Sequence, residues 1–182
     1  MAMTAAMTNL TFLHSIVLFA TATALLFAAA HDVAVRTVPN LASLIVAAVG
    51  LGQHVLDGQL IPALFGGVLV FFGAWYCWRR GWIGGGDVKL LTACVLLVPP
   101  ALVPELILST GIAGGVLALC YVALARVLPR GEAPRGQGAP RDAGLPRRVW
   151  RAERRRIRRG LSLPYSCAIT AGALLTLSVP FD

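Results

Sequence analysis

Six apolar segments account for most of the 182-residue chain and leave little material for a soluble core. Hydrophobic residues make up 57% of the sequence and charged residues 13%, which is about half the charged share of soluble domains. A membrane-spanning helix needs roughly 20 apolar residues. The pattern therefore predicts an all-α polytopic membrane protein, a bundle of six transmembrane helices. The segments are Leu10–Ala30, Leu41–Leu56, Ile61–Trp78, Val88–Val103, Leu106–Leu128 and Leu163–Val179.

The distribution of positive charge predicts how this bundle is oriented. Arg36 lies in the first connection between segments, Arg79, Arg80 and Lys89 lie in the third, and every other Arg lies in or beside the fifth. The second and fourth connections and both termini have no Lys or Arg. By the positive-inside rule, the odd connections face the cytoplasm. We therefore expect a multi-pass protein of the cell membrane, inner or plasma, with both termini extracytoplasmic.

The fifth connection, residues 129–160, is the only long polar stretch, and it is rich in Pro, Gly and Arg. Its first half has the composition of a disordered segment. Its second half, residues 147–159, could form a basic interfacial helix that binds anionic lipids. Nucleic acid is not expected as a partner, because only Trp150 could supply base stacking there. The whole chain, 1–182, is expected to be one membrane-embedded domain carrying this cytoplasmic loop.

Two aspartates fall on the predicted cytoplasmic side, Asp32 after the first segment and Asp87 before the fourth. A carboxylate at the edge of the hydrocarbon region is costly, so it indicates a functional site. Two carboxyls that share one proton are the catalytic groups of aspartic proteases. We therefore expect Asp32 and Asp87 to form one catalytic pair. The alternative for Asp32 is a loop acid paired with Arg36.

Three glycines, Gly84, Gly85 and Gly86, precede Asp87. Glycine is a poor helix former and lets another backbone approach closely. These residues are therefore expected to form a non-helical loop whose backbone receives a substrate. The alternative is a flexible turn in which Asp87 caps a helix starting at Val88. A phosphate-binding loop is disfavoured, since no G-x-x-x-x-G-K-[ST] motif is present.

The residues around these motifs have predicted supporting roles. Pro39 suits the first turn of the second helix, and Asn40 is available as its cap. Lys89 is expected to anchor the fourth helix at the interface, away from the face of Asp87. Pro164 and Tyr165 open the last segment.

Small residues four apart predict close helix packing. One such pair, Ala168 and Gly172, lies in the last segment, and another, Gly111 and Gly115, lies in the fifth.

No metal or cofactor is expected. The chain has no C-x-x-C pair and no H-E-x-x-H motif, which disfavours zinc sites of those kinds. It also has no G-x-S-x-G elbow, which disfavours serine hydrolases that use one.

Taken together, these motifs resemble the type IV prepilin peptidase family, the G-x-G-D membrane aspartic peptidases, in the short form associated with Flp/Tad pili. The similar features are an Asp followed by V-P-N, here Asp32 and residues 38–40, and G-x-G-D-x-K-L at residues 84–90. The third is P-Y-x-x-A-I-x-x-G at residues 164–172. The resemblance extends over about residues 30–172, nearly the whole chain.

The resemblance implies a membrane endopeptidase that cleaves the leader of prepilin or pseudopilin precursors at the cytoplasmic membrane face, for type IV pili or protein secretion. It also implies that Asp32 and Asp87 are the catalytic pair, one acting as base and the other as acid. Longer family members also carry a cysteine-rich region and N-methylate the product, which is not expected here. A transport subunit whose acids bind a proton or cation, a non-catalytic assembly component and a G-x-G-D peptidase for other precursors are the alternatives.

Overall fold

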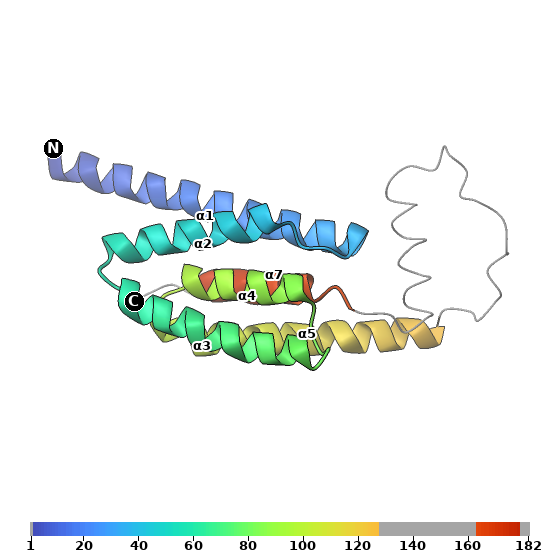
Figure 1. Ribbon diagram of the computed structural model, residues 1–182. Coiled ribbons are helices and arrows are strands. Elements are labelled where there is room, and N and C mark those ends of the chain that lie inside the picture. Colours follow the sequence, from blue (N-terminus) through green and yellow to red (C-terminus); the bar gives the residue numbers. More distant parts are fainter. Residues whose placement is uncertain (1, 128–162, 179–182) are drawn as a thin grey trace.

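The computed structural model describes residues 2–127 and 163–178, with side chains described from Val17 onward. Six α-helices and one short 3-10 helix make up this part of the chain, which contains no strand (Figure 1). The prediction of an all-α protein is confirmed. The elements are α1 (Ala2–Val35), α2 (Asn40–Leu56), α3 (Leu60–Arg79), α4 (Gly85–Leu97), η1 (Pro100–Leu102), α5 (Val103–Val127) and α7 (Tyr165–Ser178).

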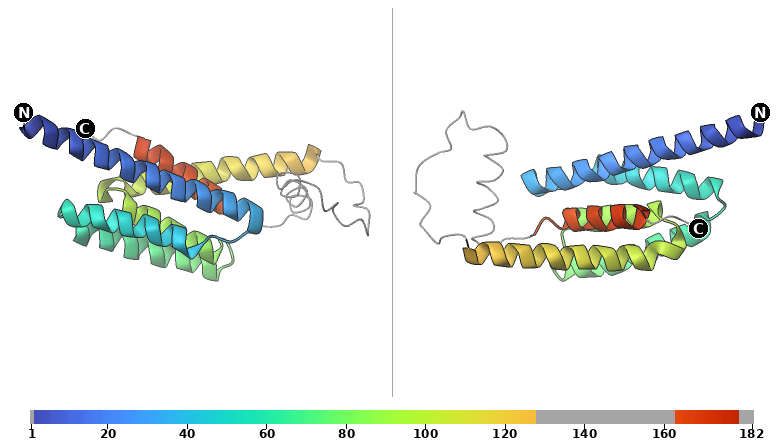
Figure 2. Two further views of the ribbon diagram at one scale, coloured as in Figure 1. Left: turned by 90° about the horizontal axis from the view of Figure 1, so that it is seen from above. Right: turned by 180° about the vertical axis from the view of Figure 1, so that it is seen from behind.

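Helix α4 lies at the centre of the bundle and packs against α2, α3 and α7. Helix α7 lies between α1 and α5 and contacts both (Figure 2). Consecutive helices alternate in direction, so one end of the bundle holds the C-terminal end of α1 and the first residues of α2, α4 and α7 (Figure 1). This end, which we call the dyad end, carries both motif aspartates, on α1 and α4.

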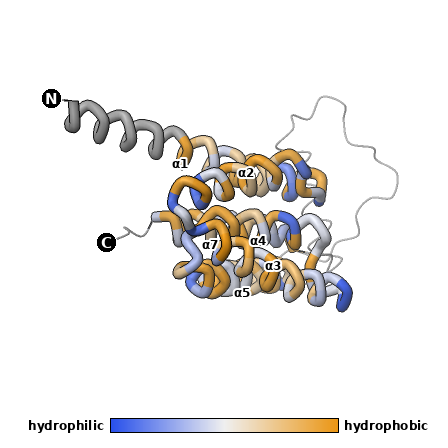
Figure 3. The backbone as a smooth tube through the Cα atoms, turned by 60° about the vertical axis from the view of Figure 1, so that its left-hand side comes forward, coloured by the Kyte–Doolittle hydropathy of each residue, from blue (hydrophilic) through white to orange (hydrophobic). Residues whose placement is uncertain are grey.

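Three helical stretches are long and apolar enough to cross a membrane: Val17–Val35, Leu60–Arg79 and Pro100–Val127. Helices α2 and α7 are apolar but shorter. Large apolar side chains also cover the outside of the bundle, among them Phe65, Leu69 and Phe72 on α3. Hydrophobic residues recur along all the described helices (Figure 3). Because such a surface is stable in lipid rather than in water, the chain is a membrane protein with several apolar helices. Six crossings and extracytoplasmic termini remain predictions.

Two helix boundaries near the aspartates differ from those expected. Helix α1 continues to Val35 instead of ending at Ala30, so Asp32 lies inside its last turn. Helix α4 begins at Gly85 instead of Val88, so the expectation that all three glycines are non-helical was wrong. The Asp87 carboxylate stabilises this start of the helix by accepting a hydrogen bond from the N–H of Gly84.

Helix α4 ends at Leu97, well before the expected Val103. Prolines 99 and 100 have no N–H to donate, and the residue before a proline is pushed into extended backbone. Val98 is extended accordingly, with ψ 150°. The chain restarts as η1 and continues into α5.

The predicted packing role of Gly172 is confirmed, because a Cβ there would overlap the backbone of Thr110 in α5. The prediction for Gly111 and Gly115 was wrong, since nothing in the described residues lies within 4 Å of a Cβ built on either. Gly114 makes the contact instead, and the ring of Tyr165 occupies the space its side chain would fill. Thr110 and Gly114 are four residues apart and share the face of α5 that meets α7.

The predicted disordered loop at 129–160 and interfacial helix at 147–159 lie outside the described residues. Their lipid partners therefore stay predictions.

Candidate active site

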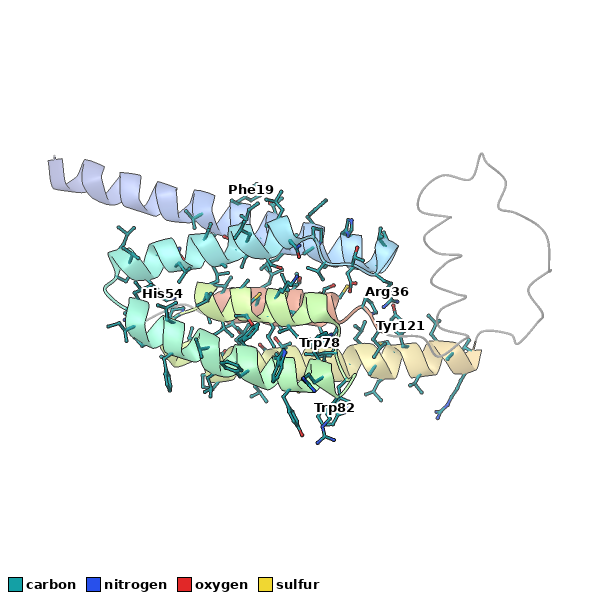
Figure 4. All side chains as sticks on the ribbon, viewed as in Figure 1. Phe19, Arg36, His54, Trp78, Trp82 and Tyr121 are labelled. Carbon is teal, nitrogen blue, oxygen red and sulfur yellow. The ribbon has the colours of Figure 1, made fainter. Side chains whose placement is uncertain are left out.

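Asp32 and Asp87 are both buried at the dyad end, with 7% and 8% of their surfaces exposed. They come from the last turn of α1 and the first turn of α4. Figure 4 labels Arg36 at this end of the bundle and His54 at the other. Burying two carboxylates is costly unless each is hydrogen-bonded or one is protonated. The groups around each carboxylate therefore indicate whether it is hydrogen-bonded and whether its protonated form is favoured.

Asp32 accepts a hydrogen bond from α7. The hydroxyl of Ser166 donates to Oδ2 of Asp32 at 2.7 Å, and Ser166 is fully buried. One turn further along α7, the Thr170 hydroxyl donates to the carbonyl of Leu25 at 3.1 Å, which aligns α7 against α1. Sequence reasoning did not single out Ser166. The signal was the spacing of Ser166 and Thr170, two hydroxyl residues four positions apart on one face of a largely apolar helix.

Asp87 is the third residue of α4, and its carboxylate reaches back to the start of the helix. Its Oδ2 accepts a hydrogen bond from the backbone N–H of Gly84 at 3.1 Å. A carboxylate in this place pairs with an unsatisfied N–H and with the positive end of the helix dipole. The alternative, in which Asp87 caps a helix beginning at Val88, was wrong. Gly84 occupies the cap position.

The other oxygen of Asp87, Oδ1, is buried and has no hydrogen-bond partner among the described residues. Burial first, and then the negative charge of Asp32, raise the pKa of Asp87 from its ordinary range to about 6. The Gly84 N–H and the positive charge of Arg36 partly offset this rise. The two carboxylates are therefore close enough for their charges to interact, although they are 55 residues apart in sequence.

Arg36 is the first residue after α1, the helix that carries Asp32. Its backbone adopts the left-handed conformation, φ 62°, and its N–H donates to the carbonyl of Asp32 at 2.7 Å. This is a left-handed helix terminus of the kind usually formed by glycine. The turn directs the chain back across the dyad end, where the Nδ1 of His31 lies 2.7 Å from the carbonyl of Thr37. The positive charge of Arg36 is thereby held within reach of Asp87.

The glycines place α4 directly against the connection between α1 and α2. A Cβ built on Gly86 would lie 3.0 Å from the Cβ of Val38, closer than side chains usually pack. Gly85 lies against the indole of Trp78, and a Cβ on Gly84 would lie 2.9 Å from Oδ2 of Asp87. Of the three glycines expected to receive a substrate, Gly84 is the exposed one.

A polar contact joins the same two elements. The ammonium group of Lys89 donates to Oδ1 of Asn40 at 3.1 Å. Asn40 is the first residue of α2, and Pro39 precedes it in extended backbone with no side-chain cap. The expectation that Asn40 caps α2 was therefore wrong. Its side chain instead ties the start of α2 to the start of α4 through Lys89, two residues after Asp87.

The start of α7 completes the dyad end. Pro164 sits just before the helix, and its carbonyl accepts the N–H of Cys167 at 3.1 Å. The ring of Tyr165 fills the space beside Gly114. These contacts fix the first turn of α7, which carries Ser166.

The arrangement is suited to acid–base chemistry. One carboxyl is supported by a hydroxyl donor. The other is buried, carries an unpartnered oxygen and has a raised pKa. A buried carboxyl with a raised pKa that interacts with a second carboxylate is the kind of arrangement that acid–base catalysis uses.

One comparison with known proteins gives a match. The model of the type IV leader peptidase family matches residues 10–119, which contain both aspartates and exclude α7. No curated protein matches, and no solved structure does.

Proposed function

Because the chain belongs to the type IV leader peptidase family, we propose that it is a membrane aspartic endopeptidase that cleaves the leader of type IV prepilin-like precursors, of the Flp type. The observation that carries this proposal is that Asp32 and Asp87 are both buried at one end of the bundle and that the charge of Asp32 acts on Asp87. Paired carboxyls with one shared proton hydrolyse peptide bonds without a covalent intermediate.

In the proposed reaction, a water molecule between the carboxyls attacks the scissile carbonyl carbon. The ionised carboxylate takes a proton from this water, and the protonated carboxyl donates its proton to the carbonyl oxygen. The tetrahedral intermediate then collapses. The C–N bond breaks, the leaving nitrogen receives the proton that the base had taken, and a hydroxyl of the intermediate returns a proton to the other carboxylate as the C=O bond reforms.

We assign Asp32 as the base and Asp87 as the acid. The Ser166 hydroxyl donates to Asp32, and a donor stabilises the ionised form of a carboxyl. Asp87 has the raised pKa and an oxygen without a partner, and both favour its protonated form. The raised pKa follows from burial beside a second negative charge, so Asp32 itself helps to keep the proton on Asp87.

We propose that the dyad end faces the cytoplasm. Arg36, Arg79, Arg80 and Lys89 all belong to connections or helix ends at this end of the bundle, and Arg126 lies in the last turn of α5. At the other end, the α2–α3 connection carries the acidic residue Asp57. This separation of charge matches the positive-inside rule and supports a cytoplasmic position for the proposed catalytic pair, where a basic leader would be presented.

The test is co-expression of the chain with a candidate prepilin, followed by the mobility of the precursor on a gel. Wild type is compared with Asp32→Asn and Asp87→Asn at equal abundance in the membrane. We expect the mature form with wild type alone, with processing reduced at least about 100-fold in each variant, because general acid–base groups contribute factors of that size. Processing by either variant at the wild-type rate would refute the proposal.

A further inference from the structure

The end of α3 carries a group of basic and aromatic side chains that the proposed acid–base chemistry does not use. Arg79 is the last residue of α3, and Arg80 follows it as the C-terminal cap. Three of the four tryptophans of the chain lie in or just after the same last turns: Trp75, Trp78 and Trp82 (Figure 4). All five side chains are exposed. Together with Tyr76 they form what we call the α3 cluster, at one end of a helix long enough to span a membrane.

The two arginines are held by aromatic rings one turn earlier on the helix. The Cζ atom of Arg79 lies 5.3 Å from the centroid of the Trp75 ring, and that of Arg80 lies 5.1 Å from the centroid of the Tyr76 ring. Nη2 of Arg80 also donates a hydrogen bond of 2.6 Å to the Tyr76 hydroxyl. Both guanidinium groups are therefore folded back along α3 instead of extending beyond its end. This places the two charges at the level of the aromatic residues, where Trp and Tyr mark the membrane–water interface.

These guanidinium groups have no anionic partner in the part of the chain that the structure describes. No ion pair joins Arg79 or Arg80 to a carboxylate there. A guanidinium that lies over a ring still presents its N–H groups in its own plane, where they match the oxygens of a phosphate. The Tyr76 hydroxyl accepts a bond from Arg80, so its own proton is available for a further acceptor. The α3 cluster therefore presents two positive charges and several donors to its surroundings.

The surroundings of α3 indicate which anion meets these donors. Phe65, Leu69 and Phe72 are exposed along the helix, so lipid chains surround it and the headgroup layer surrounds its end. A zwitterionic headgroup brings its own cation to the phosphate, whereas an anionic headgroup leaves the negative charge unbalanced. Charge complementarity therefore favours the anionic lipid.

We propose that Arg79, Arg80 and Tyr76 bind the phosphate group of an anionic phospholipid, whose acyl chains lie along α3. This site is distinct from the basic stretch at residues 147–159, and the proposal does not depend on the peptidase function. The bound headgroup adjoins the start of α4, because the indole of Trp78 in the same cluster lies against Gly85.

Quenching of tryptophan fluorescence by brominated lipid tests this site directly. The full chain carries Trp150→Phe, so that only the three tryptophans of the α3 cluster report. It is reconstituted in mixtures of phosphatidylglycerol and phosphatidylcholine with matched acyl chains, and only one of the two lipids is brominated in each mixture. We expect the relative binding constant to favour phosphatidylglycerol by about 5- to 30-fold, since each Arg near a membrane surface contributes a factor of about five.

Single charge-removing variants show whether the two arginines cause this preference. Arg79→Gln and Arg80→Gln should each lower it about fivefold. The matched control is Arg126→Gln, which removes the same charge from the last turn of α5, outside the α3 cluster. This control should keep the wild-type preference. Far-UV circular dichroism is used to select variants with the wild-type helix content.

Three results would overturn the proposal. Equal quenching by the two brominated lipids in wild type would show that the arginines only anchor the helix at the interface. An equal loss of preference with Arg126→Gln would assign the effect to the general surface charge. Inorganic phosphate, compared with chloride at equal ionic strength, should leave the preference unchanged, and displacement of phosphatidylglycerol by it would indicate a site for the free anion instead of a lipid.

Discussion

The hydroxyl of Ser166 donates a hydrogen bond of 2.7 Å to Oδ2 of Asp32, joining residues 134 positions apart in the sequence. The bond is fully buried at the serine, so no bulk water can replace it. It links the last described helix to the residue that we propose as the base. The orientation of that carboxylate therefore depends on how α7 packs against α1.

Replacing this serine tests the proposed base directly. We expect Ser166→Ala to lower kcat by about 10- to 100-fold, because a hydrogen bond to a charged group contributes roughly 1.5–3 kcal/mol. KM should change little, because the hydroxyl bonds the carboxylate and not the substrate.

The control for Ser166→Ala is Thr170→Ala, which removes the hydrogen bond from α7 to the Leu25 carbonyl without touching a carboxylate. If both variants lowered kcat equally, Ser166 would be a packing residue only.

The raised pKa of Asp87 predicts how activity depends on pH. The protonated form of Asp87 is the proposed acid, and its pKa is about 6. Activity should therefore be highest below that value and fall about tenfold for each further pH unit above it, as the shared proton is lost. This fall in activity reports the ionisation of the pair of carboxyls and not of one carboxyl alone. Initial rates measured from pH 4 to 9 in detergent check this, with stability followed over the same range. A flat profile between pH 5 and 8 would contradict the assignment of the acid.

The contact between Gly86 and Val38 predicts that a larger residue at position 86 clashes with Val38 and that a smaller residue at position 38 relieves the clash. With Gly86→Ala, the new methyl group would lie 3.0 Å from the Cβ of Val38 and push α4 away from the α1–α2 connection. We expect about 1–3 kcal/mol of destabilisation and a matching loss of processing. The double variant Gly86→Ala with Val38→Gly should recover part of both, because it removes the Cβ that the new methyl group meets. Thermal unfolding and processing assays measure the two effects, and a double variant no better than Gly86→Ala would contradict this reading.

The hydrogen bond between Lys89 and Asn40 predicts a coupling between the starts of α4 and α2. Because both side chains are exposed, we expect a coupling free energy of at most about 1 kcal/mol in a double-mutant cycle of Lys89→Met and Asn40→Ala. The coupling should appear in processing rate as well as in stability, since the bond positions the turn that carries Asp87. Additive effects in both measurements would show that the two residues act independently.

Several features of this protein were predictable from the sequence because they depend on local composition. The apolar segments determine that the described chain is helical, and the basic residues in alternate connections predict a common side for Asp32 and Asp87. Helix ends were less predictable. Asp87 was expected to precede or cap α4, but its carboxylate stabilises a start that includes two glycines.

The contacts that orient the carboxyls depended on the tertiary structure alone. Successive residues of a helix point about 100° apart, so an apolar helix with little pattern around its axis does not reveal which face meets a neighbour. For this reason the sequence did not indicate that α5 contacts α7 through Gly114 and not Gly115. It also did not indicate that Ser166 donates a hydrogen bond to Asp32. The residue types and their order along the chain determined which chemistry was available. The rotation and close approach of the helices decided that Asp32 receives a hydrogen bond from Ser166. They also decided that Asp87 has a raised pKa and one oxygen without a partner among the described residues.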